Sequence, residues 1–418
     1  MLRLLSTALL LIQEPATAAD TLTPLATGRA QKVTLLFVGT EEVDFRDAEG
    51  VARTLPRKKA RKLGGPRTEY AAFLTGLIAA YSDQAGAEEA FAFSQWCQAH
   101  GFRRDQQLAC WRALSLDPAH VPAHEALGHQ RNGDAWLIPV AEGQWASWPD
   151  AQRLHASQEM PWTFTTMHFS VAVSGPLDRA VVITATAELL YGNALGLLQS
   201  RARMWDLCSP IRVHVWPARK RGYPDVDPNV SGYWDRGTRE LQTWLDDSSG
   251  YSRPAHYERL LAEAILDSAA VELTSSPSEI PIWMEAGFGL ILEASTQWGS
   301  GLPACVPGLA AQEWVSRDAG LASPRNAGQV AVLARADLLG PQADSLRAQS
   351  YTLLHHLLFA EDPSYQAPLR EFLHGALRNR GGGSALRSAF GAEFDRMNAN
   401  WRAFVKQEGS PRAGERGS

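Results

Sequence analysis

The sequence is poor in cysteine. It has only four cysteines in 418 residues, and none of them forms a Cys-x-x-Cys pair. Four scattered thiols exclude a disulfide framework and a cysteine metal knuckle. Cys97 and Cys110 leave two interpretations open: a disulfide across a helical hairpin in an oxidising compartment, or two buried thiols that act as small hydrophobic groups.

Long apolar runs are also lacking. Near the N-terminus, Arg3 precedes the apolar run Leu4–Ile12, and a small-x-small pattern follows at 16–18. Nine apolar residues cannot span about 30 Å of hydrocarbon. We therefore predict a secretory signal peptide at 1–19, cleaved near Ala18 or Ala19, and a secreted or periplasmic mature chain without a transmembrane segment.

Positive charge is not in excess. The formal net charge is −5, with 45% hydrophobic and 20% charged residues, which is typical of a globular protein. Nucleic acids and anionic lipids attract proteins through concentrated positive charge. We therefore expect no nucleic-acid partner, and we interpret the basic run at 57–62 as a solvated face or a linker.

Several catalytic motifs are missing. The sequence has no P-loop, no Gly-x-Ser-x-Gly elbow and no dinucleotide-binding glycine pattern, and the glycines at 381–383 indicate a loop. His-Glu-x-x-His is absent too. His124 and His129 are five positions apart, about 140° around a helix, so we interpret them as part of a solvated helical repeat. The adjacent His355 and His356 diverge by about 100°, which predicts one packed and one surface histidine.

What is present predicts an α+β fold. Alternating runs at 32–37 and 43–45 indicate a small β-meander within a β-rich unit and basic linker at 20–66. Helical periodicity follows at 67–150, where the segment from Trp96 to His129 resembles a tetratricopeptide-like helical hairpin. A larger domain is expected at 155–407, and a polar tail at 408–418.

The larger domain alternates strands and helices. Phe164–Gly175 predicts one strand, and Pro176 opens a long helix that reaches about Gln199. Ile211–Trp216 predicts a second strand. The runs Gly232–Asp235 and Leu241–Leu245 predict a hairpin.

Six segments of this domain resemble a family of bacterial secreted proteins with a C-terminal peptidase MA-like domain, which is a gluzincin-type (zincin) relative. The match covers about 160–406. The segments are HFSVAVSGPL, IRVHVWPARKRGY, VSGYWD, PIWMEAGFG, SYTLLHHLLFAEDPSYQAPLREFL and FDRMNANWRAF.

The resemblance implies a specific zinc site. Such peptidases bind zinc with both histidines of His-Glu-x-x-His and with the glutamate of a downstream Trp-x-x-Glu-Gly, and the first glutamate is the general base. Alignment on PIWMEAGFG puts Ala286 at the third ligand. Counting back along the preceding helix puts Ala262 and Leu266 at the histidine positions and Glu263 at the general base. We therefore expect neither zinc nor another cofactor.

The residues also leave a surrogate carboxylate site open. Glu263 and Asp267 lie four apart on one helix, with Glu285 on the next, and could serve as an acid/base pair or bind a hard cation. His256 lies more than a turn before Ala262. An i, i+4 carboxylate pair is typical of a solvated helix edge, which is the interpretation we favour.

Three hypotheses follow. The first is a non-catalytic pseudopeptidase that binds a protein or peptide in a cleft lined by Trp283, Gly287 and Trp234, or through the helical hairpin. The second is an active hydrolase that uses Glu263 with Asp267 or Glu285. The third is a purely structural envelope protein, against which a deep apolar groove bordered by Trp283 and Trp234 would argue.

Overall fold

The computed structural model of the chain describes residues 19–217, 232–246, 253–254, 256–297, 302, 304–306, 308 and 310–409. The fold is mixed α and β, as the sequence predicts. The predicted signal peptide lies outside the described residues except for Ala19, and the predicted polar tail lies outside them beyond Gly409.

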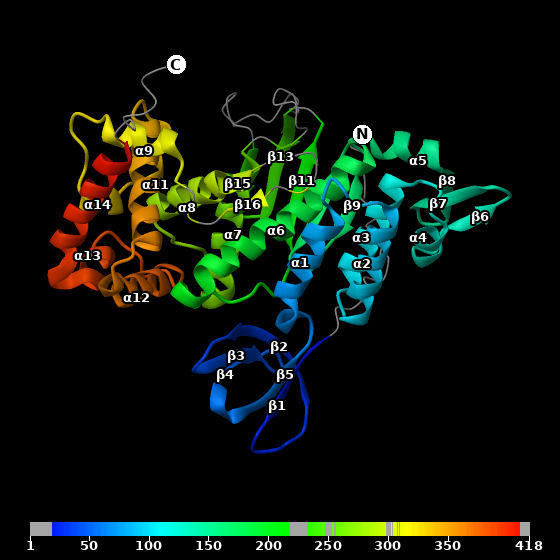
Figure 1. The fold of residues 1–418 in the computed structure, drawn as a ribbon, viewed down its shortest axis with the longest axis horizontal. Coiled ribbons are helices and arrows are strands. Elements are labelled where there is room, and N and C mark those ends of the chain that lie inside the picture. Colours follow the sequence, from blue (N-terminus) through cyan, green and yellow to red (C-terminus); the bar gives the residue numbers. More distant parts are fainter. Residues whose placement is uncertain are drawn as a thin grey trace, which may run out of the picture.

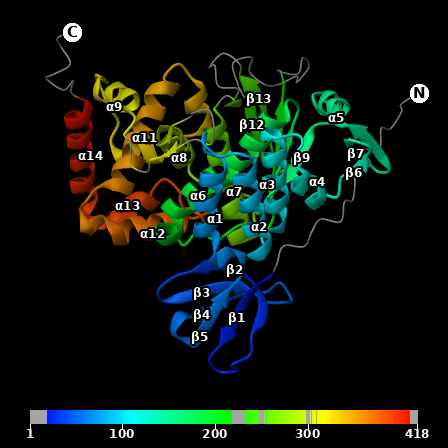
Figure 2. The same cartoon turned by 45° about the vertical axis from the view of Figure 1, so that its right-hand side comes forward.

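The N-terminal β unit is a five-stranded antiparallel sheet in the order β4-β3-β2-β1-β5. It projects from the rest of the molecule in Figures 1 and 2. Its strands are β1 (Asp20–Pro24), β2 (Gln31–Val38), β3 (Glu42–Arg46), β4 (Ala52–Pro56) and β5 (Ala60–Gly64). The basic run is not a linker, because Arg57–Lys59 forms a 3-10 turn and the rest forms β5, but its lysines are exposed as a solvated face requires. Charged side chains suit such an edge strand, since they discourage pairing with other chains.

The following region is helical only in its first part. It contains α1 (Tyr70–Ala80), α2 (Ala87–Ala99), α3 (Arg103–Leu116) and α4 (Val121–Ala126). The predicted helical region to 150 is wrong beyond Ala126. There the chain forms an antiparallel three-stranded sheet and a short helix: β6 (Gln130–Asn132), β7 (Ala135–Ala141), β8 (Gln144–Ser147) and α5 (Trp148–His155). Cys97 and Cys110 are buried free thiols on α2 and α3.

A mixed sheet in the order β12-β13-β11-β10-β9 organises the larger domain. Its strands are β9 (Trp162–Thr165), β10 (Phe169–Val173), β11 (Ile211–Trp216), β12 (Gly232–Asp235) and β13 (Glu240–Asp246), and β14 (Arg253–Pro254) pairs with β13. The three central strands are parallel, and both edge strands, β9 and β12, are antiparallel.

The single strand predicted at Phe164–Gly175 is wrong. A turn at 166–168 divides it into β9 and β10, and the Thr166 N–H donates to the Phe169 carbonyl at 2.7 Å. This turn contains neither glycine nor proline, so the sequence carries no breaker signal there. The predicted long helix is α6 (Leu177–Ala202), and the predicted hairpin is β12 with β13.

Helices complete the domain (Figure 1). The chain continues through α7 (Tyr257–Thr274), α8 (Ile282–Ser295), β15 (Thr296–Gln297), β16 (Ala304–Cys305), α9 (Gln312–Ala319), α10 (Ala327–Ala331), the 3-10 helix η4 (Arg335–Leu339), α11 (Ala343–Phe359), α12 (Gln366–Ala376), α13 (Ala385–Phe390) and α14 (Phe394–Gly409). One large core joins these helices to α1 and to the mixed sheet. By length and composition α6 could cross a membrane, but 78% of its most apolar window is buried inside the protein.

Both histidine pairs differ from expectation. His124 and His129 are buried rather than solvated, because α4 ends at Ala126 and the chain then turns back. Their Nδ1 atoms lie 2.7 Å apart, and His124 stacks on Trp136. His355 and His356 are also both buried, so the prediction of one surface histidine is wrong.

Candidate functional site

The helix pair α7 and α8 presents apolar side chains where the resemblance requires metal ligands. Ala262 and Leu266 are fully buried, and Ala286 is half-buried against the core. Zinc needs nitrogen, sulfur or oxygen donors, which these three side chains lack. The residues present therefore do not fit a zinc ion at these positions.

Three carboxylates converge beside those positions. Glu263 and Asp267 lie one turn apart on α7, and Glu285 lies in the first turn of α8. Arg236, which directly follows β12, forms ion pairs with all three. Its guanidinium nitrogens lie 3.6 Å from Glu263 Oε1 and 3.6 Å from Asp267 Oδ1, and it donates a hydrogen bond to Glu285 Oε1.

Local backbone structure holds Arg236 in place. The Asp235 carboxylate accepts hydrogen bonds from the Gly237 and Thr238 N–H groups at 2.8 and 3.2 Å, which fixes the turn between β12 and β13. Arg236 also donates to the Ser278 carbonyl at 3.3 Å, just before α8. The guanidinium is thereby anchored from both sides.

A second arginine completes the group. Arg335, on η4, places one guanidinium nitrogen 3.0 Å from Glu263 Oε1 and 3.0 Å from Glu285 Oε2. We call these five residues, Arg236, Glu263, Asp267, Glu285 and Arg335, the carboxylate–arginine cluster. They come from the β12–β13 turn, two helices and η4, which are far apart in the sequence.

Burial and charge affect the two sides of the cluster differently. Burial and the neighbouring Glu263 raise the pKa of Glu285 to about 7, although Arg236 and Arg335 both oppose this shift. Burial alone would lower the pKa of Arg236, but Glu285, Asp267 and Glu263 hold it above its ordinary value. Arg236 is therefore a permanent cation, whereas Glu285 titrates near neutral pH.

The sequence interpretation of Glu263 and Asp267 as a solvated edge is wrong for Asp267, whereas the Glu263 side chain is 21% exposed. The Asp267 side chain is only 3% exposed and that of Glu285 only 4%. Sequence reasoning also missed Arg236 and Arg335. Each lies in a turn or short 3-10 segment with no periodic pattern, so only the three-dimensional fold reveals its partners.

The expected cleft-lining residues have other positions. Trp283 is fully buried and stacks on Phe372 at 5.8 Å, so it lines no cleft. Gly287 is a packing contact, because a Cβ there would lie 2.6 Å from the Ser350 carbonyl oxygen of α11. Trp234 borders a cavity of about 160 Å³, together with Arg212, Arg239 and Ser268.

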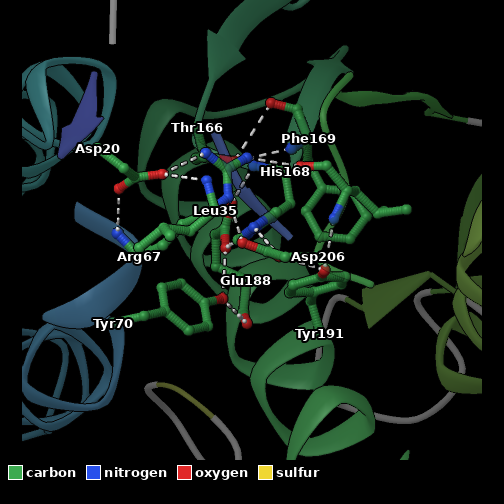
Figure 3. Close-up of polar contacts among 11 residues, drawn as sticks. Asp20, Leu35, Arg67, Tyr70, Thr166, His168, Phe169, Glu188, Tyr191 and Asp206 are labelled. Atoms are coloured by element: carbon green, nitrogen blue, oxygen red, sulfur yellow. Dashed lines mark hydrogen bonds and ion pairs between the residues drawn. The ribbon is translucent and has the colours of Figure 1, made fainter. Parts of the chain in front are cut away.

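A second polar centre joins the β9–β10 turn to α6 and α1 (Figure 3). His168 is fully buried, with Nδ1 2.9 Å from Glu188 Oε2 and Nε2 2.9 Å from Asp206 Oδ1. Tyr70 donates to Glu188 at 2.8 Å, and Tyr191 donates to Asp206 at 2.5 Å. We call these five residues the buried histidine centre.

The buried histidine centre is ionised. Burial alone would lower the pKa of His168, but the Glu188 and Asp206 carboxylates raise it to about 9. In turn, His168 and the other hydrogen-bond partners of Glu188 and Asp206 outweigh burial, so the pKa of each carboxyl group lies below its ordinary value. This centre could not be predicted from the sequence, where His168 reads only as part of a strand. Its complete burial gives a substrate no access, which indicates a structural role.

Comparisons with known proteins identify no relative: no protein-family model matches the chain, and no curated protein matches it. Within the described part of the chain, no three histidine, cysteine, aspartate or glutamate side chains are grouped so that they could hold a metal ion. The role of the carboxylate–arginine cluster must therefore be inferred from its geometry and charge. Its carboxylates bind internal guanidinium groups.

Proposed function

We propose that this chain is a secreted, non-catalytic relative of gluzincin-type peptidases, a pseudopeptidase that binds a peptide or protein. One observation carries the proposal. The carboxylates nearest to the would-be ligand positions bind Arg236 and Arg335, while the positions themselves are occupied by Ala262, Leu266 and Ala286. Carboxylates that bind arginine are poorly suited to bind a metal or activate water, because their charge and lone pairs are engaged.

The arrangement around the cluster supports peptide binding. β12 is an edge strand of the mixed sheet, and it leads directly into Arg236. An extended peptide can add to a sheet edge through main-chain hydrogen bonds, and neighbouring side chains then select its sequence. The half-exposed Arg236 and Arg335 would be the selecting side chains.

The further assignments belong to the same proposal. The order of the mixed sheet, α7 and α8 supports a zincin-type domain, and the paired helices α2 and α3 support a tetratricopeptide-like hairpin. Export through the N-terminal signal peptide is proposed from the sequence alone.

Three measurements test the proposal. Elemental analysis of the signal-free protein is expected to give no stoichiometric zinc, and a broad peptide mixture is expected to remain uncleaved by the wild type and by Glu263→Ala alike. Peptides selected on the immobilised protein should protect β12 from hydrogen exchange. Stoichiometric zinc with chelator-sensitive cleavage would refute the proposal, and protection confined to α2 and α3 would move the binding site to the hairpin.

The alternative is a hydrolase that uses Glu263 with Glu285 or Asp267. The observation in its favour is that these carboxylates converge and that Glu285 has a pKa of about 7, which suits a general acid or base at neutral pH. The same peptide mixture separates the two proposals. Cleavage without metal that is lost in both Glu263→Gln and Glu285→Gln would establish the hydrolase.

A purely structural envelope protein is the third possibility. The buried Trp283 borders no groove, so the apolar groove that would have argued against a structural role does not form between it and Trp234. Failure to select any peptide would favour this role.

A further inference from the structure

A separate cavity shares no lining residue with the carboxylate–arginine cluster. It has a volume of about 290 Å³ and lies between α12 and α13. Its polar lining consists of His374, Arg380, Ser388 and Glu371, and Phe372 contributes to its apolar wall. A volume of this size admits a small organic molecule rather than a macromolecule.

Positive charge is concentrated beside this cavity. Arg378 and Arg380 follow the C-terminal end of α12, and within the described ranges neither forms an ion pair with a carboxylate. Arg203, at the end of α6, is also near, but Asp44 and Glu42 neutralise it. Arg380 lines the cavity and Arg378 lies beside it, so the two supply positive charge that Asp44 only partly offsets, and Glu371 is the one acidic side chain of the lining.

The pKa values of Arg378 and His374 reflect this concentration of positive charge. Burial, Arg203 and Arg380 lower the pKa of Arg378 to about 10, and Asp44 only partly offsets them. Burial, Arg378, Arg203 and Arg380 lower the pKa of His374 to about 4, with Asp44 again opposing. Perturbed pKa values cluster at functional sites, and a bound anion would relieve this repulsion.

The loop that carries the two arginines is fixed before any ligand binds. The Arg378 and Arg380 N–H groups both donate to the Gly375 carbonyl, at 3.0 and 2.9 Å. Asn379, at φ 58°, accepts from the Glu279 N–H and donates to the Pro277 carbonyl through its side chain. A preorganised loop reduces the entropy lost on binding.

We propose that this cavity binds a small dianionic oxyanion, of the phosphomonoester or sulfate class, through Arg380 and the Ser388 hydroxyl, with Arg378 supplying further positive charge beside it. Guanidinium groups bind such oxyanions by charge-assisted and often bidentate hydrogen bonds. Binding would relieve the repulsion on His374, which could then take up a proton and add a further donor. The site is independent of the function proposed for the carboxylate–arginine cluster.

The first test titrates sulfate, which stays a dianion over the relevant pH range, against a chloride control of equal ionic strength. Histidine C–H resonances, with His374 assigned through His374→Gln, report the result. Sulfate is expected to raise the pKa of His374 from about 4 towards its ordinary value. Inorganic phosphate and glycerol phosphate should also bind, and tighter binding of the ester would identify an organic phosphomonoester as the preferred class. No saturable effect of sulfate or phosphate would overturn the proposal.

Matched variants separate a built site from a diffuse positive field. Arg380→Gln should weaken sulfate binding by about tenfold or more, because it removes a charge-assisted hydrogen-bond donor. Arg370→Gln removes the same charge from an exposed position on the same helix and should have little effect. Equal weakening by both variants would overturn the proposal. If Arg380→Gln does not fold, Arg380→Lys keeps the charge and loses the bidentate fork, and it should still bind more weakly than wild type.

The same experiments test a simpler role for Arg378 and Arg380, which is to stabilise the C-terminal end of α12. Cations near the C-terminal end of a helix stabilise it through the helix dipole, and Arg378 donates to the His374 carbonyl at 3.1 Å. If capping were their whole purpose, Arg378→Gln and Arg380→Gln would lower thermal stability while wild type bound no sulfate. That outcome would refute the anion site.

Discussion

Glu285 is a carboxyl group whose ionisation opposes folding. Its pKa is about 7 in the folded protein against 4.5 in the unfolded chain, because burial and Glu263 outweigh the two arginines. Between these values the folded state binds more protons than the unfolded state. The stability contributed by protonated Glu285 is therefore complete below about pH 4.5 and is lost as pH rises through 7.

Glu285→Gln should remove this dependence. The neutral amide resembles the protonated carboxyl, so the variant should match wild type near pH 5 and exceed it at pH 8 by on the order of 2 kcal/mol. Urea unfolding at pH 5, 6, 7 and 8 measures the difference. Glu125→Gln, at an exposed glutamate of α4, is the control. Parallel pH profiles for wild type and Glu285→Gln would show that the arginines keep this carboxyl ionised.

At the scale of elements, the turn between β9 and β10 is held to α6 by the buried histidine centre. The pKa of His168 is raised to about 9. Its ionisation therefore contributes stability to the fold that is fully present below about pH 6.5 and is lost as pH rises through 9. The lowered pKa values of Glu188 and Asp206 give contributions that are present above about pH 4.5 and are lost as pH falls. This centre therefore stabilises the fold most between these limits.

His168→Gln should be strongly destabilising at pH 6. Removing one partner of a buried ion pair leaves uncompensated charge, which costs about 3–5 kcal/mol. The loss should be smaller above pH 9, where wild type has already lost most of the contribution. Chemical denaturation at both pH values measures it, with the exposed His100→Gln as control. A loss independent of pH would mean that His168 stabilises the turn as a neutral group.

The contact between α8 and α11 depends on one glycine. A Cβ at Gly287 would meet backbone atoms of Ser350, which cannot rotate away. Gly287→Ala should therefore destabilise by about 1–3 kcal/mol through overpacking. Gly196→Ala is the matched control, since nothing lies within 4 Å of a Cβ there, and it should stabilise α6 by about 0.5–1 kcal/mol. Thermal unfolding of both variants tests the contrast, and a neutral Gly287→Ala would show that the helices can shift apart.

At the scale of the whole molecule, periodic elements could be predicted from the sequence and junctions could not. The periodicity and breakers of α6 and of the β12–β13 hairpin identify them correctly. β5 was missed because it is an edge strand of charged residues, and β9 and β10 were merged because their turn has no breaker. Glu263, Asp267 and Glu285 could be named as a group, but Arg236 and Arg335 reach them only through tertiary contacts.

The attachment of the N-terminal sheet to the rest of the protein also depends on tertiary contacts that the sequence does not reveal. Its own core consists of only six buried side chains: Leu22, Val33, Leu35, Val43, Phe45 and Ala60. A unit of this size is marginal alone, because it buries too little surface. Polar contacts hold it to the rest of the protein. Arg67 bridges Asp20 and Asp206 at 3.2 and 2.6 Å, and Arg203 pairs with Asp44 at 2.6 Å.

Arg203→Asn should loosen this attachment without unfolding the larger domain. Arg203 has φ 50°, a left-handed conformation that asparagine tolerates, so the substitution mainly removes the ion pairs to Asp44 and Glu42. Hydrogen exchange should become faster in β2 and β3 and remain unchanged in α7 and α8. Arg201→Gln, on the last turn of α6, is the control. Faster exchange throughout the molecule would instead mean that the sheet and the larger domain unfold as one cooperative unit, so that the sheet draws its stability from the whole core.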